Sequence, residues 1–124
     1  MTNTYGFGGD DLARVKTVIE TALGIHLEAR ESFYRGGDYY LAKLPGGDQV
    51  ALQKNLDLVG GSLRHEEYPE VGLLLLVSSS NRADEFRERL MQVEGIRHLT
   101  RTVLTPEGKL SVERITAGSP TTEL

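Results

Sequence analysis

A chain of 124 residues is long enough for one hydrophobic core and too short for two, so the sequence predicts a single domain. It has no cysteine, which excludes disulfides, zinc ribbons and thiol catalysis. Its net charge of -4 argues against a nucleic-acid partner, because such proteins usually present a basic face. No apolar run approaches the roughly 20 residues that span a bilayer, and the first residues do not resemble a signal peptide. We therefore expect a cytoplasmic protein without a membrane partner.

The sequence begins with a polar, glycine-rich segment, residues 1–9, which we expect to be a flexible N-terminus. The first helix is expected directly after this segment. Asp10 or Asp11 can cap this helix by accepting hydrogen bonds from the free N–H groups of its first turn. Apolar residues then recur at helical spacing, and Gly24 follows at a position where a left-handed residue commonly ends a helix. The predicted helix spans 10–23.

Three strands are expected next, at 25–30, 39–44 and 49–56. In the first of them, apolar residues alternate with charged or polar ones, as in a strand with one buried face. Turn sequences rich in glycine, together with aspartate or proline, separate the three strands. Such short connections favour an antiparallel meander.

A fourth strand is expected at 72–79, where five consecutive apolar residues are typical of a central strand covered on both faces. A second helix follows, capped by Asn81 and ended by Gly95. A strand at 96–104 comes next. A short last strand at 109–115 is left open.

The predicted fold is α+β, with the element order α-β-β-β-β-α-β(-β). Neither helix can bury its apolar stripe alone, and a sheet with one solvated face cannot bury its apolar face alone. We therefore expect a mostly antiparallel sheet of five to six strands with both helices packed on one face. Residues 10–116 form this single domain, and 117–124 are expected to be a disordered tail.

No motif for catalysis or metal binding stands out. The segment His65-Glu66-Glu67 lacks the second histidine that a zinc-binding helix places four residues after the first, and residue 69 is proline. The serines at 78–80 lack the glycine frame of a nucleophile elbow. We predict no catalytic residue, no metal and no cofactor, and a protein that acts by binding rather than as an enzyme.

Aromatic residues gather at 33–40 and acidic residues at 57–70, and both segments favour a binding surface. Tyrosine and arginine are frequent at protein–protein hot spots because they offer large, rigid, amphipathic area. Residues 57–70 add four acids and one base. The alternatives are ordinary aromatic packing in a hairpin and a solvated acidic loop. The candidate partner-binding residues are Tyr34, Arg35, Asp38, Tyr39, Asp57, Glu66, Glu67, Tyr68 and Glu70.

Three short stretches carry a family resemblance. The segments SFYRGGDYY at 32–40, LQKN at 52–55 and EYPE at 67–70 resemble small bacterial immunity proteins of polymorphic-toxin and contact-dependent growth inhibition systems. The resemblance spans roughly residues 10–104. It implies a cytoplasmic toxin inhibitor that binds a cognate toxin domain, in many systems a nuclease, and covers its active site. These immunity proteins share no catalytic residues, so none is carried over.

Two other functions stay open from the sequence alone. A small enzyme or ligand-binding α+β domain would hold a pocket with convergent polar groups between the sheet and the helices. An oligomeric scaffold module would bury a long apolar strand edge by symmetry. A homodimer is also left open.

Overall fold

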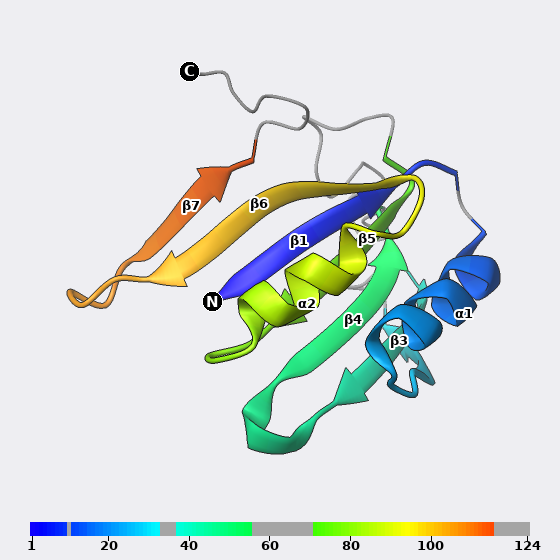
Figure 1. Ribbon diagram of the computed structural model, residues 1–124, viewed down its shortest axis with the longest axis horizontal. Helices are drawn as coiled ribbons and strands as arrows, with labels where there is room; N and C mark the ends of the chain where they lie inside the picture. The colour runs from blue at the N-terminus through cyan, green and yellow to red at the C-terminus, as the bar shows by residue number, and fades with distance from the viewer. Residues whose placement is uncertain (10, 33–36, 56–70, 116–124) are drawn as a thin grey trace.

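The computed structural model describes residues 1–9, 11–32, 37–55 and 71–115. These form one seven-stranded sheet and two α-helices (Figure 1). The elements are β1 (Thr2–Phe7), α1 (Leu12–Leu23), β2 (Glu28–Ser32), β3 (Gly37–Lys43), the short 3-10 helix η2 (Pro45–Gly47), β4 (Gln49–Lys54), β5 (Leu73–Ser78), α2 (Ala83–Leu90), β6 (Ile96–Leu104) and β7 (Leu110–Arg114). The strands lie in the order β2-β3-β4-β5-β1-β6-β7, and every neighbouring pair is antiparallel.

The N-terminal segment is a central strand, and the expectation that residues 1–9 form a flexible leader is wrong. β1 pairs along its whole length with β5 on one side and with β6 on the other. Asn3, Tyr5 and Phe7 are buried on the face that the helices cover. The element order is therefore β-α-β-β-β-β-α-β-β, with seven strands rather than five or six.

Gly6 explains part of why β1 is hard to recognise as a strand. A Cβ atom at this position would lie 2.7 Å from Cγ1 of Val71 and 3.0 Å from Cδ1 of Leu99. Glycine is rare in strands unless a neighbour approaches closely, which is the case here. The residue that makes the segment look like a loop is thus required by the packing on the second face of the sheet.

The predicted cap residues bound α1, whereas α2 is shorter than predicted and ends at Leu90 rather than before Gly95. The Asp11 side chain accepts a hydrogen bond from the backbone N–H of Arg14, and Gly24 ends α1 in the left-handed conformation, as predicted. Asp10 lies outside the described residues. The cap predicted for α2 is wrong: Arg82 occupies the N-cap position, and the Ser79 hydroxyl accepts the hydrogen bond from its backbone N–H at 2.8 Å.

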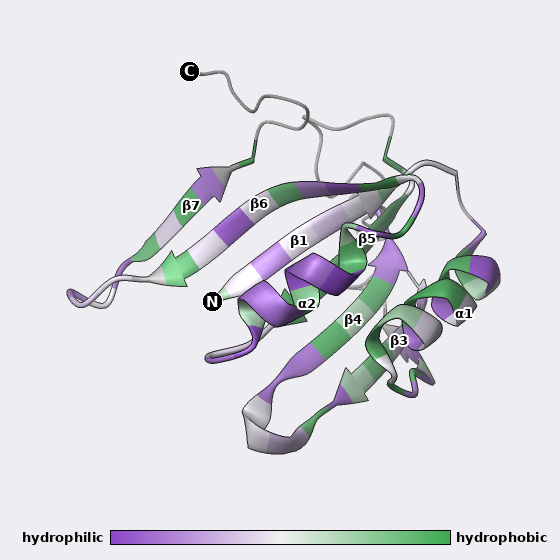
Figure 2. Ribbon diagram, in the orientation of Figure 1, coloured by the Kyte–Doolittle hydropathy of each residue, from purple (hydrophilic) through white to green (hydrophobic). Residues whose placement is uncertain are grey.

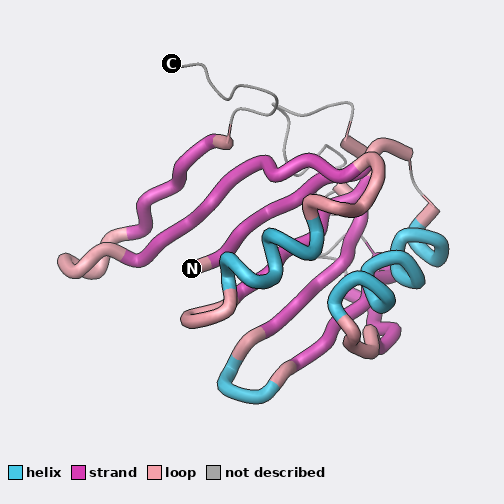
Figure 3. Tube along the Cα trace, viewed as in Figure 1, coloured by secondary structure: helices cyan, strands magenta, loops and turns pink. Residues whose placement is uncertain are grey.

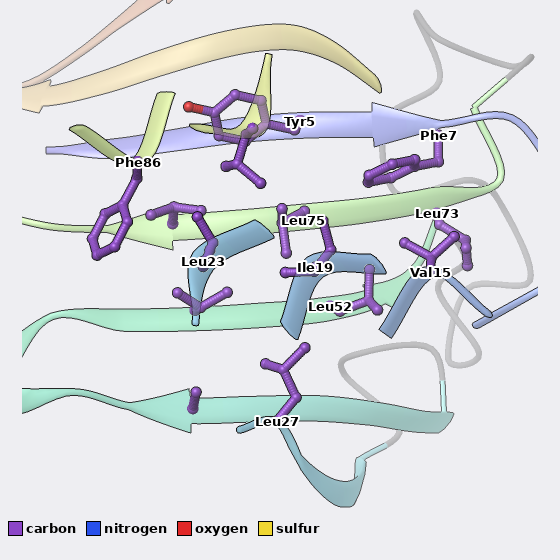
Figure 4. Close-up of a cluster of buried hydrophobic side chains, with 14 residues drawn as sticks. Tyr5, Phe7, Val15, Ile19, Leu23, Leu27, Leu52, Leu73, Leu75 and Phe86 are labelled. Carbon is purple, nitrogen blue, oxygen red and sulfur yellow. The ribbon is translucent and has the colours of Figure 1, made fainter. Parts of the chain in front are cut away.

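Both helices pack on the same face of the sheet, as predicted (Figures 1 and 3). Val15, Ile19 and Leu23 of α1 point onto the strands, and Figure 4 shows them above side chains of β4 and β5. The shorter α2 is attached through Phe86 and Leu90, and the rest of its ribbon is largely hydrophilic (Figure 2). The strands, with Leu27 just before β2, complete this core through Tyr5, Phe7, Ala42, Val50, Leu52, Leu73, Leu75 and Val77.

β5 is the doubly covered strand that its apolar run predicts. Leu73 and Leu75 face the helices, whereas Leu74 belongs to a second cluster with Val71 and Leu99 on the other face. Alternation of side chains along one strand requires this division. Within the described part of the chain, no helix is long and apolar enough to cross a membrane.

Candidate functional site

The structure describes two of the predicted partner-binding residues, Asp38 and Tyr39 in β3. As neighbours in one strand they point to opposite faces of the sheet. The Asp38 side chain is exposed, whereas that of Tyr39 is half-buried opposite Arg30. The two therefore share the sheet edge and not one flat surface. The other candidates, Tyr34, Arg35, Asp57, Glu66, Glu67, Tyr68 and Glu70, lie outside the described residues.

Asp38 has an acidic neighbour that the sequence analysis did not pair with it. Glu31 of the edge strand β2 lies directly opposite Asp38, and both side chains are exposed. We call these two residues the acidic edge pair. Within the described residues neither carboxylate has an ion-pair partner, whereas Glu28 in the same strand pairs with Arg30 at 3.2 Å. Like charges directly opposite each other destabilise a sheet, so this pair contributes nothing favourable to folding.

The opposite edge of the sheet has a different character. β7 exposes Leu110 and Val112, with 71% and 62% of their surface accessible. These are the most exposed large apolar residues in the described chain, and they lie on one face of a strand paired on one side only. The hypothesis of an oligomeric scaffold module requires an apolar strand edge that symmetry buries, and β7 is the edge with that character.

A groove of about 500 Å³ lies between the two helices, not between the helices and the sheet. The hydroxyls of Thr17 and Thr21 line it, but each already donates to a backbone carbonyl one turn earlier. Arg89 also lines it and lies 3.6 Å from Glu85. The convergent polar groups that the ligand-binding hypothesis requires are therefore not gathered there. The lining residues are Thr17, Val18, Thr21, Ala22, Arg89, Gln92 and Val93.

A buried polar cluster occupies the helix-covered face where β1, β6 and α2 meet. It consists of the buried residues Asn3, Tyr5 and His98, with the partly buried Arg101 and the exposed Arg87 at its outer side. The amide oxygen Oδ1 of Asn3 lies 3.0 Å from His98 Nε2 and 3.0 Å from Arg101 Nε. Arg87 Nε donates to His98 Nδ1 at 3.3 Å. The rings of Tyr5 and His98 stack with their centroids 4.7 Å apart.

The protonation state of His98 follows from these contacts. Because a guanidinium can only donate, Nδ1 of His98 accepts from Arg87, and the ring proton is on Nε2, which donates to Asn3. Burial, followed by the positive charges of Arg87 and Arg101, lowers the pKa of His98 to about 4. Burial raises the pKa of Tyr5 to about 12. Both rings are therefore neutral at physiological pH.

Two polar atoms of this cluster lack partners in the described structure. Nδ2 of Asn3 and the hydroxyl oxygen of Tyr5 are buried and form no hydrogen bond, although both side chains are completely inaccessible to solvent. Buried polar groups are nearly always paired, and an unpaired one costs about 1–3 kcal/mol. The cluster therefore differs from most buried hydrogen-bond networks, in which every polar group has a partner.

Sequence reasoning missed this cluster because it missed β1. The available signal was the period-two pattern of Asn3, Tyr5 and Phe7, in a segment otherwise rich in the strand-forming threonine. Its glycines and the absence of a continuous apolar run favoured a loop instead. His98 lies in a strand that was predicted, but its partner Asn3 is 95 residues away in sequence. No local pattern reports that contact.

We expect His98 to make stability depend on pH. An unperturbed histidine has a pKa of 6.5, against about 4 for His98 in the folded state. Between these values the unfolded chain binds a proton that the folded chain does not, so stability falls as the pH falls from about 6.5 to about 4, by about 3 kcal/mol in total. Urea unfolding across this range should show a steeper loss for the wild type than for His98→Gln. Equal slopes would contradict the assignment of a neutral buried histidine.

In comparisons with known proteins, no family model matches the chain and no curated protein matches it significantly. Among the residues that the structure describes, no group of three or more histidine, cysteine, aspartate or glutamate side chains could hold a metal ion.

Proposed function

We propose that this chain is a protein-binding domain that neutralises a cognate toxin by covering its active site, as the immunity proteins it resembles do. We further propose that the β2–β3 edge of the sheet carries part of the contact. The acidic edge pair is the observation behind this proposal. Glu31 and Asp38 face each other at the edge, exposed and without a basic partner among the described residues.

The charge of the edge favours a basic partner. Two opposed carboxylates repel each other in the free protein, and a cationic surface placed against them removes that repulsion. Complementary charge also accelerates encounter and selects against wrong partners. A nuclease toxin fits this requirement, because an active site that binds a polyanion is usually basic. The net charge of -4 acts in the same direction.

The edge is held in place before any partner arrives. The Glu20 carboxylate of α1 accepts a hydrogen bond at 2.8 Å from the backbone N–H of Leu27, which is buried just before β2 begins, and this bond lowers the pKa of Glu20. β3 is paired on both sides, with β2 and β4. A preformed surface loses little conformational entropy on binding, which is what a tight inhibitor requires. None of the described strands pairs with the outer side of β2, so its backbone groups there can pair with a partner strand.

A charge-reversal experiment tests the proposal. The double variant E31K/D38K should bind the product of an adjacent toxin-like gene at least about tenfold more weakly than the wild type, a loss of about 1.4 kcal/mol. The control E94K/E107K changes net charge equally at exposed sites outside the edge and should bind like the wild type. Isothermal titration calorimetry measures both, and circular dichroism checks that each variant stays folded. Equal weakening by both double variants would show that only overall charge matters and would remove the edge from the account.

A further inference from the structure

We propose that the buried polar cluster of Asn3, Tyr5, Arg87, His98 and Arg101 is a binding site for a small free carboxylate. This inference is independent of the toxin-binding proposal and concerns the opposite half of the sheet. It rests on two buried donors without partners that lie in one cluster with two arginines.

The orientation of the Asn3 amide is fixed by its neighbours. Its Oδ1 faces Nε of Arg101 and Nε2 of His98, both of which carry protons. Turning the amide over would set its NH₂ group against the Arg101 donor, an unfavourable contact between two donors. Nδ2 of Asn3 therefore points away from both, as a buried donor that needs an acceptor.

The cluster lacks acceptors, not donors. Oδ1 of Asn3 already accepts two hydrogen bonds, and Nδ1 of His98 accepts from Arg87. A water molecule that accepted from Asn3 and Tyr5 would bring two hydrogens of its own, and the side chains of the cluster offer no acceptor for them, because the Tyr5 oxygen cannot accept from the molecule to which it donates. A carboxylate brings two acceptor oxygens and no proton, which matches what the cluster leaves unpaired.

The charge around the cluster also selects an anion. Arg87 and Arg101 each donate to the cluster through Nε, and both guanidinium groups carry further N–H donors on their terminal nitrogens. The acid that faces them is Asp84, whose carboxylate lies 3.7 Å from Nη2 of Arg101 but is 95% exposed. An ion pair so open to water gains little, so it leaves the site cationic. His98 adds no charge because it is neutral.

The position of the two arginines indicates how a ligand would enter. Arg87 is exposed on α2 and Arg101 is about one-quarter exposed, whereas Asn3 and Tyr5 are fully buried, so a ligand would meet the two arginines first. In Figure 4 Tyr5 lies at the β1–β6 side of the core, far from Leu27 at the β3 side. α2 has only eight residues and is attached mainly by Phe86 and Leu90. Because Asn3 and Tyr5 are fully buried, the site favours a small free acid over a side chain of another protein.

The test uses acetate and formate as probes at pH 7.5 and constant ionic strength, with chloride as the reference anion. We expect saturable shifts in the NMR signals of the His98 ring and of the Asn3 side-chain amide, together with a rise in the unfolding temperature. Tyr5→Phe and Arg87→Gln should each weaken acetate binding at least about tenfold, because each removes a hydrogen bond to a charged group. Arg14→Gln, an exposed arginine on α1, should leave it unchanged.

A second variant keeps the proposal falsifiable if the probes bind weakly. Asn3→Asp retains the oxygen that His98 and Arg101 use and replaces the unpaired NH₂ group with a carboxylate oxygen. If the site is built for a carboxylate, this variant should fold, unfold at the same or a higher temperature than the wild type, and no longer respond to acetate. A variant that fails to fold, or a wild type whose response to acetate equals its response to chloride, would overturn the proposal.

Discussion

Deletion of residues 1–9 is expected to abolish the folded state. The segment contains β1, which lies between β5 and β6 in the sheet, so its loss removes two antiparallel backbone ladders, one with each neighbour. It also removes Tyr5 and Phe7 from the core, where 0% and 5% of their surface is accessible. Removing one buried aromatic side chain costs about 3–5 kcal/mol, so two exhaust most of a stability of about 5–15 kcal/mol.

Circular dichroism and thermal unfolding measure this effect directly. The truncated chain should show no cooperative transition, whereas the full chain should. Adding a synthetic peptide of residues 1–9 supplies the missing strand in trans and should restore part of the transition. A truncated chain that unfolds cooperatively near the temperature of the full chain would show that β1 is not integral to the sheet.

Replacing Phe86 with alanine should destabilise the domain by about 3–5 kcal/mol, because the side chain is fully buried and leaves a cavity. α2 is short and its other buried residue is Leu90, so the loss of packing mainly weakens the contact of this helix with the sheet. The buried polar cluster lies beneath α2 and should become accessible. Exchange of the Asn3 and His98 side-chain protons should therefore accelerate more than exchange in β3 and β4.

Two substitutions control for the Phe86 result. Phe86→Leu keeps most of the buried volume and should cost clearly less than the alanine variant. Met91→Ala, at the end of the same helix, removes a side chain from a residue that is 43% exposed and should change stability by less than about 0.5 kcal/mol. Equal losses for Phe86→Ala and Met91→Ala in urea unfolding would contradict the packing described for α2.

The parts of the fold that sequence predicts are those with local signals. α1 follows from its apolar spacing, Asp11 and Gly24, and β5 follows from its run of apolar residues. The strand at 96–104 is confirmed with its predicted limits. Each of these depends on residues within one segment. The α+β class and the placement of both helices on one face follow because few other arrangements bury all the apolar stripes.

The parts that sequence does not predict depend on pairing across the chain. β1 is a strand because β5 and β6 satisfy its backbone and Val71 fills the space at Gly6. The acidic edge pair depends on the register that sets Glu31 opposite Asp38, and a shift of one residue would separate them. Asp38 was identified as a candidate from composition, but its partner requires the structure.

Hydrogen–deuterium exchange of this chain, alone and with the product of an adjacent toxin-like gene, tests the central proposal most directly. If the acidic edge contacts the toxin, protection on complex formation should concentrate in β2 and β3, residues 28–32 and 37–43, and E31K/D38K should reduce it. Protection confined to β7 or to α2, with β2 and β3 exchanging as in the free protein, would contradict the proposed binding edge.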